Sequence, residues 1–250
     1  MLVLPMWSTM SLFSRYCLFR VLLNLFVCAL LGGMAPQVGI AMPAQRRPAP
    51  DVAMPQTAHE LGWVRTLRTQ AEAGDPFAQT ALGACYELGE GVPQDLSAAI
   101  AWYEKALAVG WSGAMVRLGK CYAEGRGVPC DKRKAVELWL TAANKPIAPR
   151  SLEEPHVHEA RAALARALRL GEGVPQDVSE AVAIALPAAA WGLPEAEYEL
   201  GLCYLATGLK QDVAAARHWL EQALAHGHAT AGETLRQLTA DGQHRGEAKR

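Results

Sequence analysis

Apolar residues recur at helical spacing through most of the 250-residue chain, and strand-like alternation is absent. Ala78, Leu82, Gly83 and Tyr86 stand at positions i, i+4, i+5 and i+8, which at about 100° per residue form one stripe of an amphipathic helix. The same pattern starts again near Ala114, Ala160 and Ala196. We therefore expect an all-α protein that contains four copies of one repeat.

A glycine-rich turn follows the first helix of each unit. Gly-x-Gly-Val-Pro-x-Asp occupies 89–95, 125–131 and 171–177, and a decayed copy occupies 207–212. The glycines supply the positive φ that ends a helix, and Asp suits the N-cap of the second helix that follows. The resulting signature of the repeat consists of Leu82, Gly83, Tyr86, Gly89, Gly91, Asp95, Trp102, Leu118, Gly119, Tyr122, Gly125, Gly127, Asp131, Gly171, Gly173, Asp177, Leu200, Gly201, Tyr204, Asp212 and Trp219.

A single helix–turn–helix unit cannot bury its own apolar stripe, whereas stacked copies bury it continuously. The stripe therefore predicts a solenoid over 59–239, with half copies at about 61–74 and from Ala231 onward. An insertion at about 145–155, rich in Pro and Glu, lengthens the connection between the second and third copies.

The segment Ala78–Ala106 reads Ala-x3-Leu-Gly-x2-Tyr-x2-Gly-x-Gly-Val-x2-Asp-x3-Ala-x2-Trp-Tyr-x-Lys-Ala, which resembles the Sel1-like repeat, a relative of the tetratricopeptide repeat. The resemblance covers roughly 67–238 and implies a right-handed superhelical solenoid of about four repeats that binds other proteins or peptides. The third copy departs from the pattern, because Ala165 replaces the Gly, Leu168 the Tyr and Ile184 the Trp.

The N-terminus has the order of an export signal. Arg15 and Arg20 precede an apolar run at 21–31, and small residues before and at Ala41 offer a cleavage site. We therefore expect a signal peptide at 1–41 and a periplasmic or secreted protein, with an uncleaved signal anchor as the alternative. That anchor would be the chain's only membrane contact.

Two further segments flank the solenoid. Four prolines in 42–58 favour an extended linker, and the polar residues 240–250 favour a flexible tail.

The near-balance of charge, 24 Lys and Arg against 25 Asp and Glu, argues against a nucleic-acid partner. No nucleophile motif, zinc-protease motif or phosphate loop is present, so the sequence predicts neither an enzyme nor a cofactor. Histidines at 156 and 158, and at 218, 226 and 228, lack a neighbouring ligand at a diagnostic spacing, so we expect no metal site.

Cysteines 85, 121 and 203 precede the Tyr of their copies and are expected to pack, whereas Cys130 lies in a turn and could be an exposed thiol. Some exported relatives bridge their helices with paired cysteines, which this chain lacks.

The first helix of each repeat is expected to line the concave face. There the sequence predicts a basic patch of Arg117, Lys120, Arg166 and Arg169 for an acidic or C-terminal carboxylate partner, with Tyr198 beside it. An ordinary solvated helix face is the competing interpretation. The alternative functions are an envelope enzyme acting on cell-wall or β-lactam compounds, an activity attributed to cysteine-rich relatives, and a self-assembling structural solenoid.

Overall fold

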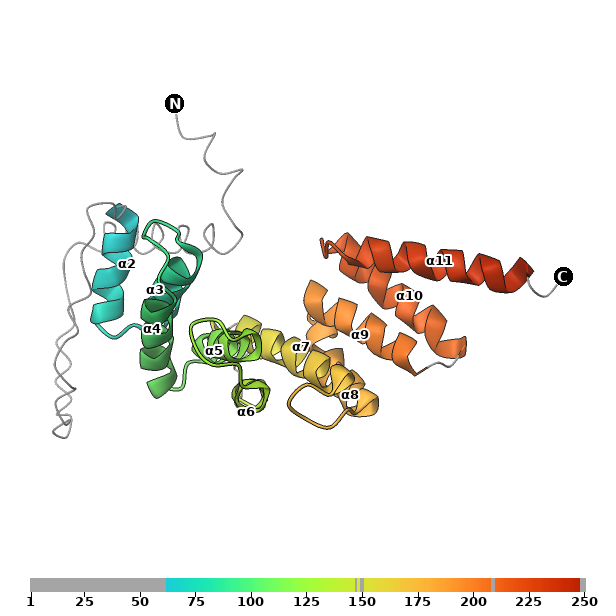
Figure 1. Ribbon diagram of the computed structural model, residues 1–250, viewed down its shortest axis with the longest axis horizontal. Coiled ribbons are helices and arrows are strands. Elements are labelled where there is room, and N and C mark those ends of the chain that lie inside the picture. The colour runs from blue at the N-terminus through green and yellow to red at the C-terminus, as the bar shows by residue number, and fades with distance from the viewer. Residues whose placement is uncertain (1–61, 147, 149–150, 208–209, 248–250) are drawn as a thin grey trace, which may run out of the picture.

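The fold is an arc of antiparallel helix pairs (Figure 1). A computed structural model describes residues 62–146, 148, 151–207 and 210–247. The expected signal peptide and linker lie outside these residues. Within them no helix is long and apolar enough to cross a membrane.

The described residues form helices throughout and confirm the all-α prediction. The helices are α2 (Gly62–Glu72), α3 (Pro76–Leu88), α4 (Leu96–Ala108), α5 (Ser112–Glu124), α6 (Lys132–Ala143), α7 (Glu154–Leu170), α8 (Val178–Ala190), α9 (Pro194–Ala206), α10 (Lys210–Ala225) and α11 (Ala231–Glu247). Four pairs, α3/α4, α5/α6, α7/α8 and α9/α10, correspond to the four predicted copies, and each helix packs against the next along the chain. Helices α2 and α11 are the half copies, and α11 continues into the segment expected as a tail.

The predicted caps form in the first three repeats. The side chains of Asp95, Asp131 and Asp177 each accept a hydrogen bond from the backbone N–H three residues later, at 2.9–3.0 Å. Asp212 differs, because α10 begins at Lys210 and places it within the first helical turn. Its Oδ2 instead accepts a hydrogen bond of 2.5 Å from the Thr207 hydroxyl.

The glycine inside each first helix allows a large side chain of the second helix to approach. A Cβ on Gly83 would stand 2.5 Å from Cε1 of Tyr103, and one on Gly119 would overlap the indole of Trp139. The residue opposite the glycine is therefore Tyr103 or Trp139, one position after the Trp102 position emphasised by the sequence pattern. In the third repeat Ala165 and Ala185, both fully buried, occupy these two positions. The two helices of a repeat thus pack closely in two ways: with glycine on the first helix and a large side chain on the second, or with alanine on both.

The core runs along the whole arc between the two layers of helices. Leu107 and Tyr122 contact both of its halves, so the apolar packing is continuous from the first repeat to the second. At the N-terminal end α2 buries Val64 and Leu67 and exposes Arg65. This polar outer face is typical of a capping repeat.

The insertion ends earlier than the sequence suggested. Helix α7 begins at Glu154, so the last residues of the expected insertion are helical. Lys145 holds its two ends together, since its Nζ lies 2.5 Å from Glu153 Oε1 and donates a 2.7 Å hydrogen bond to the Gly110 carbonyl.

Candidate interaction surface

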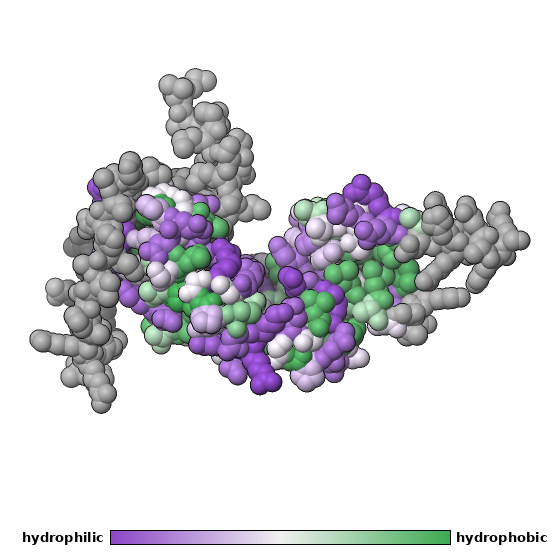
Figure 2. Space-filling model, viewed as in Figure 1, coloured by the Kyte–Doolittle hydropathy of each residue, from purple (hydrophilic) through white to green (hydrophobic). Residues whose placement is uncertain are grey.

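The inner side of the arc is built by the first helices of the repeats. In Figure 1, α5 and α7 lie on the inner side and α6 and α8 on the outer side. Helix α5 contacts both α3 and α7, and α7 contacts α9. Figure 2 shows a hollow above this layer, between the two ends of the molecule. We call the inner surface of α3, α5, α7 and α9 the concave face.

Two of the predicted basic residues are available on the concave face. Lys120 and Arg166 are exposed, and each stands six positions after the alanine that begins its repeat. Within the described residues neither forms an ion pair. They are therefore equivalent cations on consecutive repeats.

Arg117 is engaged inside the protein. Its Nη1 lies 3.8 Å from Oε2 of Glu87, whose side chain is only 6% exposed. Glu87 also receives Arg126 Nη1 at 3.0 Å and a hydrogen bond of 2.5 Å from the Tyr103 hydroxyl. Burial raises the pKa of Tyr103, which therefore stays protonated as the donor. The Glu87 cluster thus joins the first two repeats and neutralises much of the Arg117 charge.

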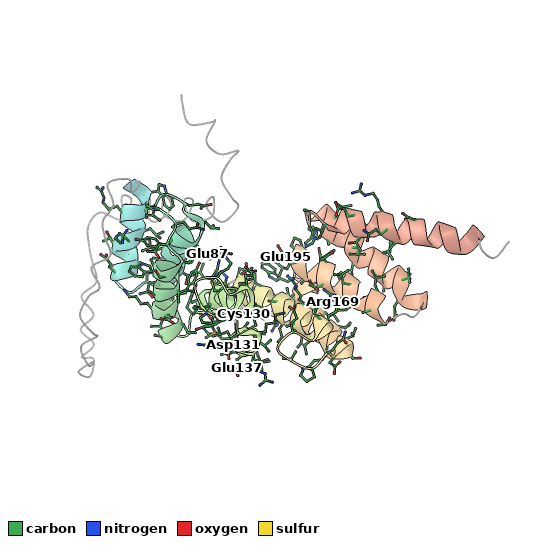
Figure 3. The ribbon with its side chains drawn as sticks, in the orientation of Figure 1. Glu87, Cys130, Asp131, Glu137, Arg169 and Glu195 are labelled. Carbon is green, nitrogen blue, oxygen red and sulfur yellow. The ribbon has the colours of Figure 1, made fainter. Side chains whose placement is uncertain are left out.

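Arg169 is engaged in the same way between the third and fourth repeats. Its Nε and Nη2 donate hydrogen bonds of 3.0 and 2.9 Å to Oε2 of Glu199, and the two side chains are 16% and 11% exposed. Figure 3 places Glu87 to the left of the hollow and Arg169 between α7 and α9. Neither acidic partner is among the residues predicted from the sequence, although each lies 30 residues from its arginine, close to one repeat length.

Tyr198 faces the C-terminal half copy. Its ring stacks on His228 with the centroids 4.1 Å apart, and its hydroxyl lies 3.4 Å from Oγ1 of Thr234 on α11. The adjacent Glu197 is buried and contacts Nδ1 of His226 at 2.8 Å. Tyr198 and Glu197 therefore fasten the turn before α11 to α9.

The comparisons with known proteins agree with this architecture. The family model described as Sel1 repeat matches residues 76–110, 112–146, 158–190 and 194–228, more than half of the chain. The chain belongs to the Sel1 repeat family. A search of curated proteins found no match.

Two solved structures are similar to this Sel1 repeat protein. A Sel1 repeat protein from Oxalobacter formigenes is 28% identical, with a TM-score of 0.56 over 69% of this chain and 67% of that chain. The uropathogenic Escherichia coli protective antigen c5321, which displays an SLR fold, is 29% identical, with a TM-score of 0.59 over 72% of this chain. This chain spans 36% of the length of c5321.

The recurring cysteines of the Sel1 repeats lie in the core. Cys85, Cys121 and Cys203 are buried, and burial raises the pKa of the Cys121 and Cys203 thiols to about 11. Cys130 is exposed, and its Sγ lies 3.4 Å from the Ala123 carbonyl.

The turn position of Cys130 is occupied by glutamine in two other repeats. The Nε2 of Gln94 donates to the Glu87 carbonyl at 2.9 Å, and that of Gln176 to the Arg169 carbonyl at 2.7 Å. Cys130 therefore fills a structural place in the turn.

The histidines of the third repeat lie inside α7. The His156 ring meets Trp111 edge-on at 5.9 Å, and its Nδ1 lies 3.5 Å from Oε2 of Glu159. His158 is buried and stacks on Trp191 at 5.0 Å. Burial, followed by the charge of Arg161, lowers the pKa of His158. No group of three or more His, Cys, Asp or Glu that could hold a metal ion occurs among the described residues.

Proposed function

We propose that this Sel1 repeat protein is an exported scaffold that binds a protein or a peptide through its concave face. The observation that carries the proposal is the pair of equivalent, exposed cations Lys120 and Arg166 on the inner helices α5 and α7. Beside this surface, neighbouring helices are held together by contacts of Arg117, Arg169 and Tyr198. A rigid curved layer of helices suits such binding because little conformational freedom is lost when a partner docks.

Site-specific cross-linking tests which face of the solenoid binds the partner. A photo-activatable amino acid replaces Glu195 in one variant and Glu137 in another, with the full chain expressed in each case. Both glutamates are exposed, and Figure 3 places Glu195 at the rim of the hollow and Glu137 on the outer side, on α6. We expect one saturable cross-linked partner from position 195 and none from position 137. The same partner cross-linked only from position 137 would contradict binding on the concave face.

Export is tested by the mass of the mature chain. The full chain with a C-terminal tag is recovered from a bacterial host, and its N-terminus is determined by mass spectrometry. We expect it to begin at Met42, and Ala41→Phe to prevent that cleavage. Recovery of the uncleaved chain from the cytosolic fraction would contradict the export proposal.

The outer side of α2 does not favour self-assembly by end-to-end stacking. The outer side of α2 exposes Arg65, Thr69 and Glu72, and such polar groups disfavour a dry interface.

A further inference from the structure

The charges on the concave face divide into engaged and available groups. Arg117 and Arg169 are held by the buried glutamates Glu87 and Glu199. The Glu159 carboxylate lies near His156. Partial burial would raise the pKa of Glu159, but His156, Lys120 and Arg117 outweigh this effect and hold the pKa below its ordinary value. Lys120 and Arg166 form no ion pair among the described residues. Glu159 interacts with Lys120 only at longer range, so the surface still offers two cations to a partner.

The spacing of these two cations follows from helix packing. Lys120 and Arg166 occupy the same position of α5 and α7, which contact each other directly. Packed helices lie about 8–10 Å apart, so a ligand that crosses both helices meets one cation per helix at about that interval. The next residue in the row is Leu202 on α9, which is half-buried and apolar.

Only one extended backbone presents side chains on one face at this interval. A polyproline II helix has three residues per turn and rises about 3.1 Å per residue, so residues j and j+3 point the same way about 9 Å apart. In a β-strand, residues on one face are about 7 Å apart at j+2 or about 13 Å apart at j+4. The row therefore matches the polyproline II spacing.

We propose that the concave face binds an acidic peptide segment in the polyproline II conformation, laid across α5, α7 and α9. Two carboxylates three residues apart pair with Lys120 and Arg166, and an apolar residue three positions further along contacts Leu202. The proposal rests on the proposed function and narrows it to one class of partner. The pairs are charge-assisted hydrogen bonds on an exposed surface, so binding weakens as the salt concentration rises.

Synthetic peptides test the spacing directly. Fluorescein-labelled peptides of identical composition, made of Pro, Ala, one Leu and two Glu, place the two Glu residues two, three or four positions apart. Their binding to the full chain is measured by fluorescence anisotropy at low ionic strength. We expect the three-residue spacing to bind at least about tenfold more tightly than the other two, as a difference of about 1.4 kcal/mol gives. Equal affinity for the three spacings would overturn the proposal.

Charge reversal tests the two cations. Lys120→Glu with Arg166→Glu should abolish binding of the Glu-x-x-Glu peptide and create binding of a matching Lys-x-x-Lys peptide. The control, Arg133→Glu with Arg217→Glu, changes the net charge equally at exposed positions of the outer helices α6 and α10 and should retain the original specificity. The proposal would be overturned if Lys120→Glu with Arg166→Glu bound the Glu-x-x-Glu peptide as tightly as the unchanged protein, with the same free energy of unfolding and helical content.

The two proposals fail in different ways. If none of the peptides binds but the cross-links from position 195 still form, the acidic-peptide proposal fails and the concave-face scaffold stands. If the peptides bind with the expected spacing and position 195 captures no cellular partner, the surface recognises acidic peptides and the scaffold role in the cell fails.

Discussion

Two junctions between repeats use the same pair of positions with opposite charges. Between the first and second repeats, Glu87 on α3 meets Arg117 on α5. Between the third and fourth, Arg169 on α7 meets Glu199 on α9. Counted from the first alanine of each repeat, the glutamate of one junction is equivalent to the arginine of the other. Where charged residues occupy these two positions they are complementary, and either helix can carry either sign.

The middle junction shows that the ion pair is dispensable. There the two equivalent positions are Ala123 and Ala163, and the helices α5 and α7 still contact each other. Apolar packing therefore sets the register in which the repeats stack. Charged residues at these two positions are compatible with that register only when they form a pair. Once a charge is placed in this half-buried site, its partner becomes necessary because an unpaired charge there is costly.

The largest expected effect comes from breaking the pair between the third and fourth repeats. Arg169→Glu or Glu199→Arg alone places like charges together in a half-buried site, and each should lower the free energy of unfolding by about 3 kcal/mol. The double variant restores complementarity in the polarity of the first junction and should recover most of that loss. Urea unfolding of the four proteins gives the coupling energy.

The reversed pair is informative because its geometry has a precedent within the same chain. A double variant as unstable as the sum of its single variants would show that the two junctions are not equivalent. The same exchange at Lys132 and Glu172, which are 2.9 Å apart but 47% and 39% exposed, serves as the control and should change stability by less than about 1 kcal/mol.

A packing variant separates helix contact from charge. Gly119→Ala leaves Arg117 and Glu87 in place but drives a Cβ into the indole of Trp139, so α6 must shift away from α5. We expect a loss of about 1–3 kcal/mol in the free energy of unfolding. The opposite change, Ala165→Gly in the third repeat, creates no clash and should cost about 1–2 kcal/mol through lower helix propensity and the loss of one buried methyl group. Equal losses by urea unfolding would show that the tight crossing at Gly119 has no special cost.

The regular part of the fold was predictable from the sequence because it depends on local patterns. The caps at Asp95, Asp131 and Asp177 and the close approach at Gly83 and Gly119 need only residues of one repeat. These features follow from turn chemistry and helical periodicity.

The state of the candidate site was not predictable in the same way. The pattern of each helix places Arg117 and Arg169 on its exposed stripe and therefore predicts two free cations. Their acidic partners lie in the neighbouring repeats, and a charge pair across a junction depends on side-chain positions that the pattern of one helix does not contain. A search for opposite charges one repeat apart could have found Glu87 and Glu199.

Mild acid acts on a buried group that lies outside the two charged junctions. His158 is buried against Trp191, and burial followed by the charge of Arg161 lowers its pKa, with Glu154 acting weakly in the opposite direction. A lowered pKa means that the unfolded chain binds more protons, so this contribution is present above the ordinary value of 6.5 and is lost as the pH falls below it.

His158→Leu should therefore lose less stability than the unchanged protein between pH 7 and about pH 5.5. Urea unfolding at several pH values measures this difference. His218→Leu, at an exposed position of α10, is the control and should leave the pH dependence unchanged. Parallel pH profiles for His158→Leu and the unchanged protein would show that His158 is not the acid-sensitive group.

The smallest expected effect concerns the turn that precedes α6. Cys130 occupies the place where Gln94 and Gln176 donate side-chain hydrogen bonds to a carbonyl, and its own contact with the Ala123 carbonyl is longer, at 3.4 Å. Cys130→Gln should raise the free energy of unfolding by less than about 0.5 kcal/mol, because an amide donates more strongly than a thiol but the site is open to water. Gln176→Cys should lower it by a similar amount, and both changes are measured by urea unfolding. Opposite signs of equal size would show that the turns of the second and third repeats are interchangeable, even though the junctions beside them differ in charge; a loss of stability in both variants would contradict that equivalence.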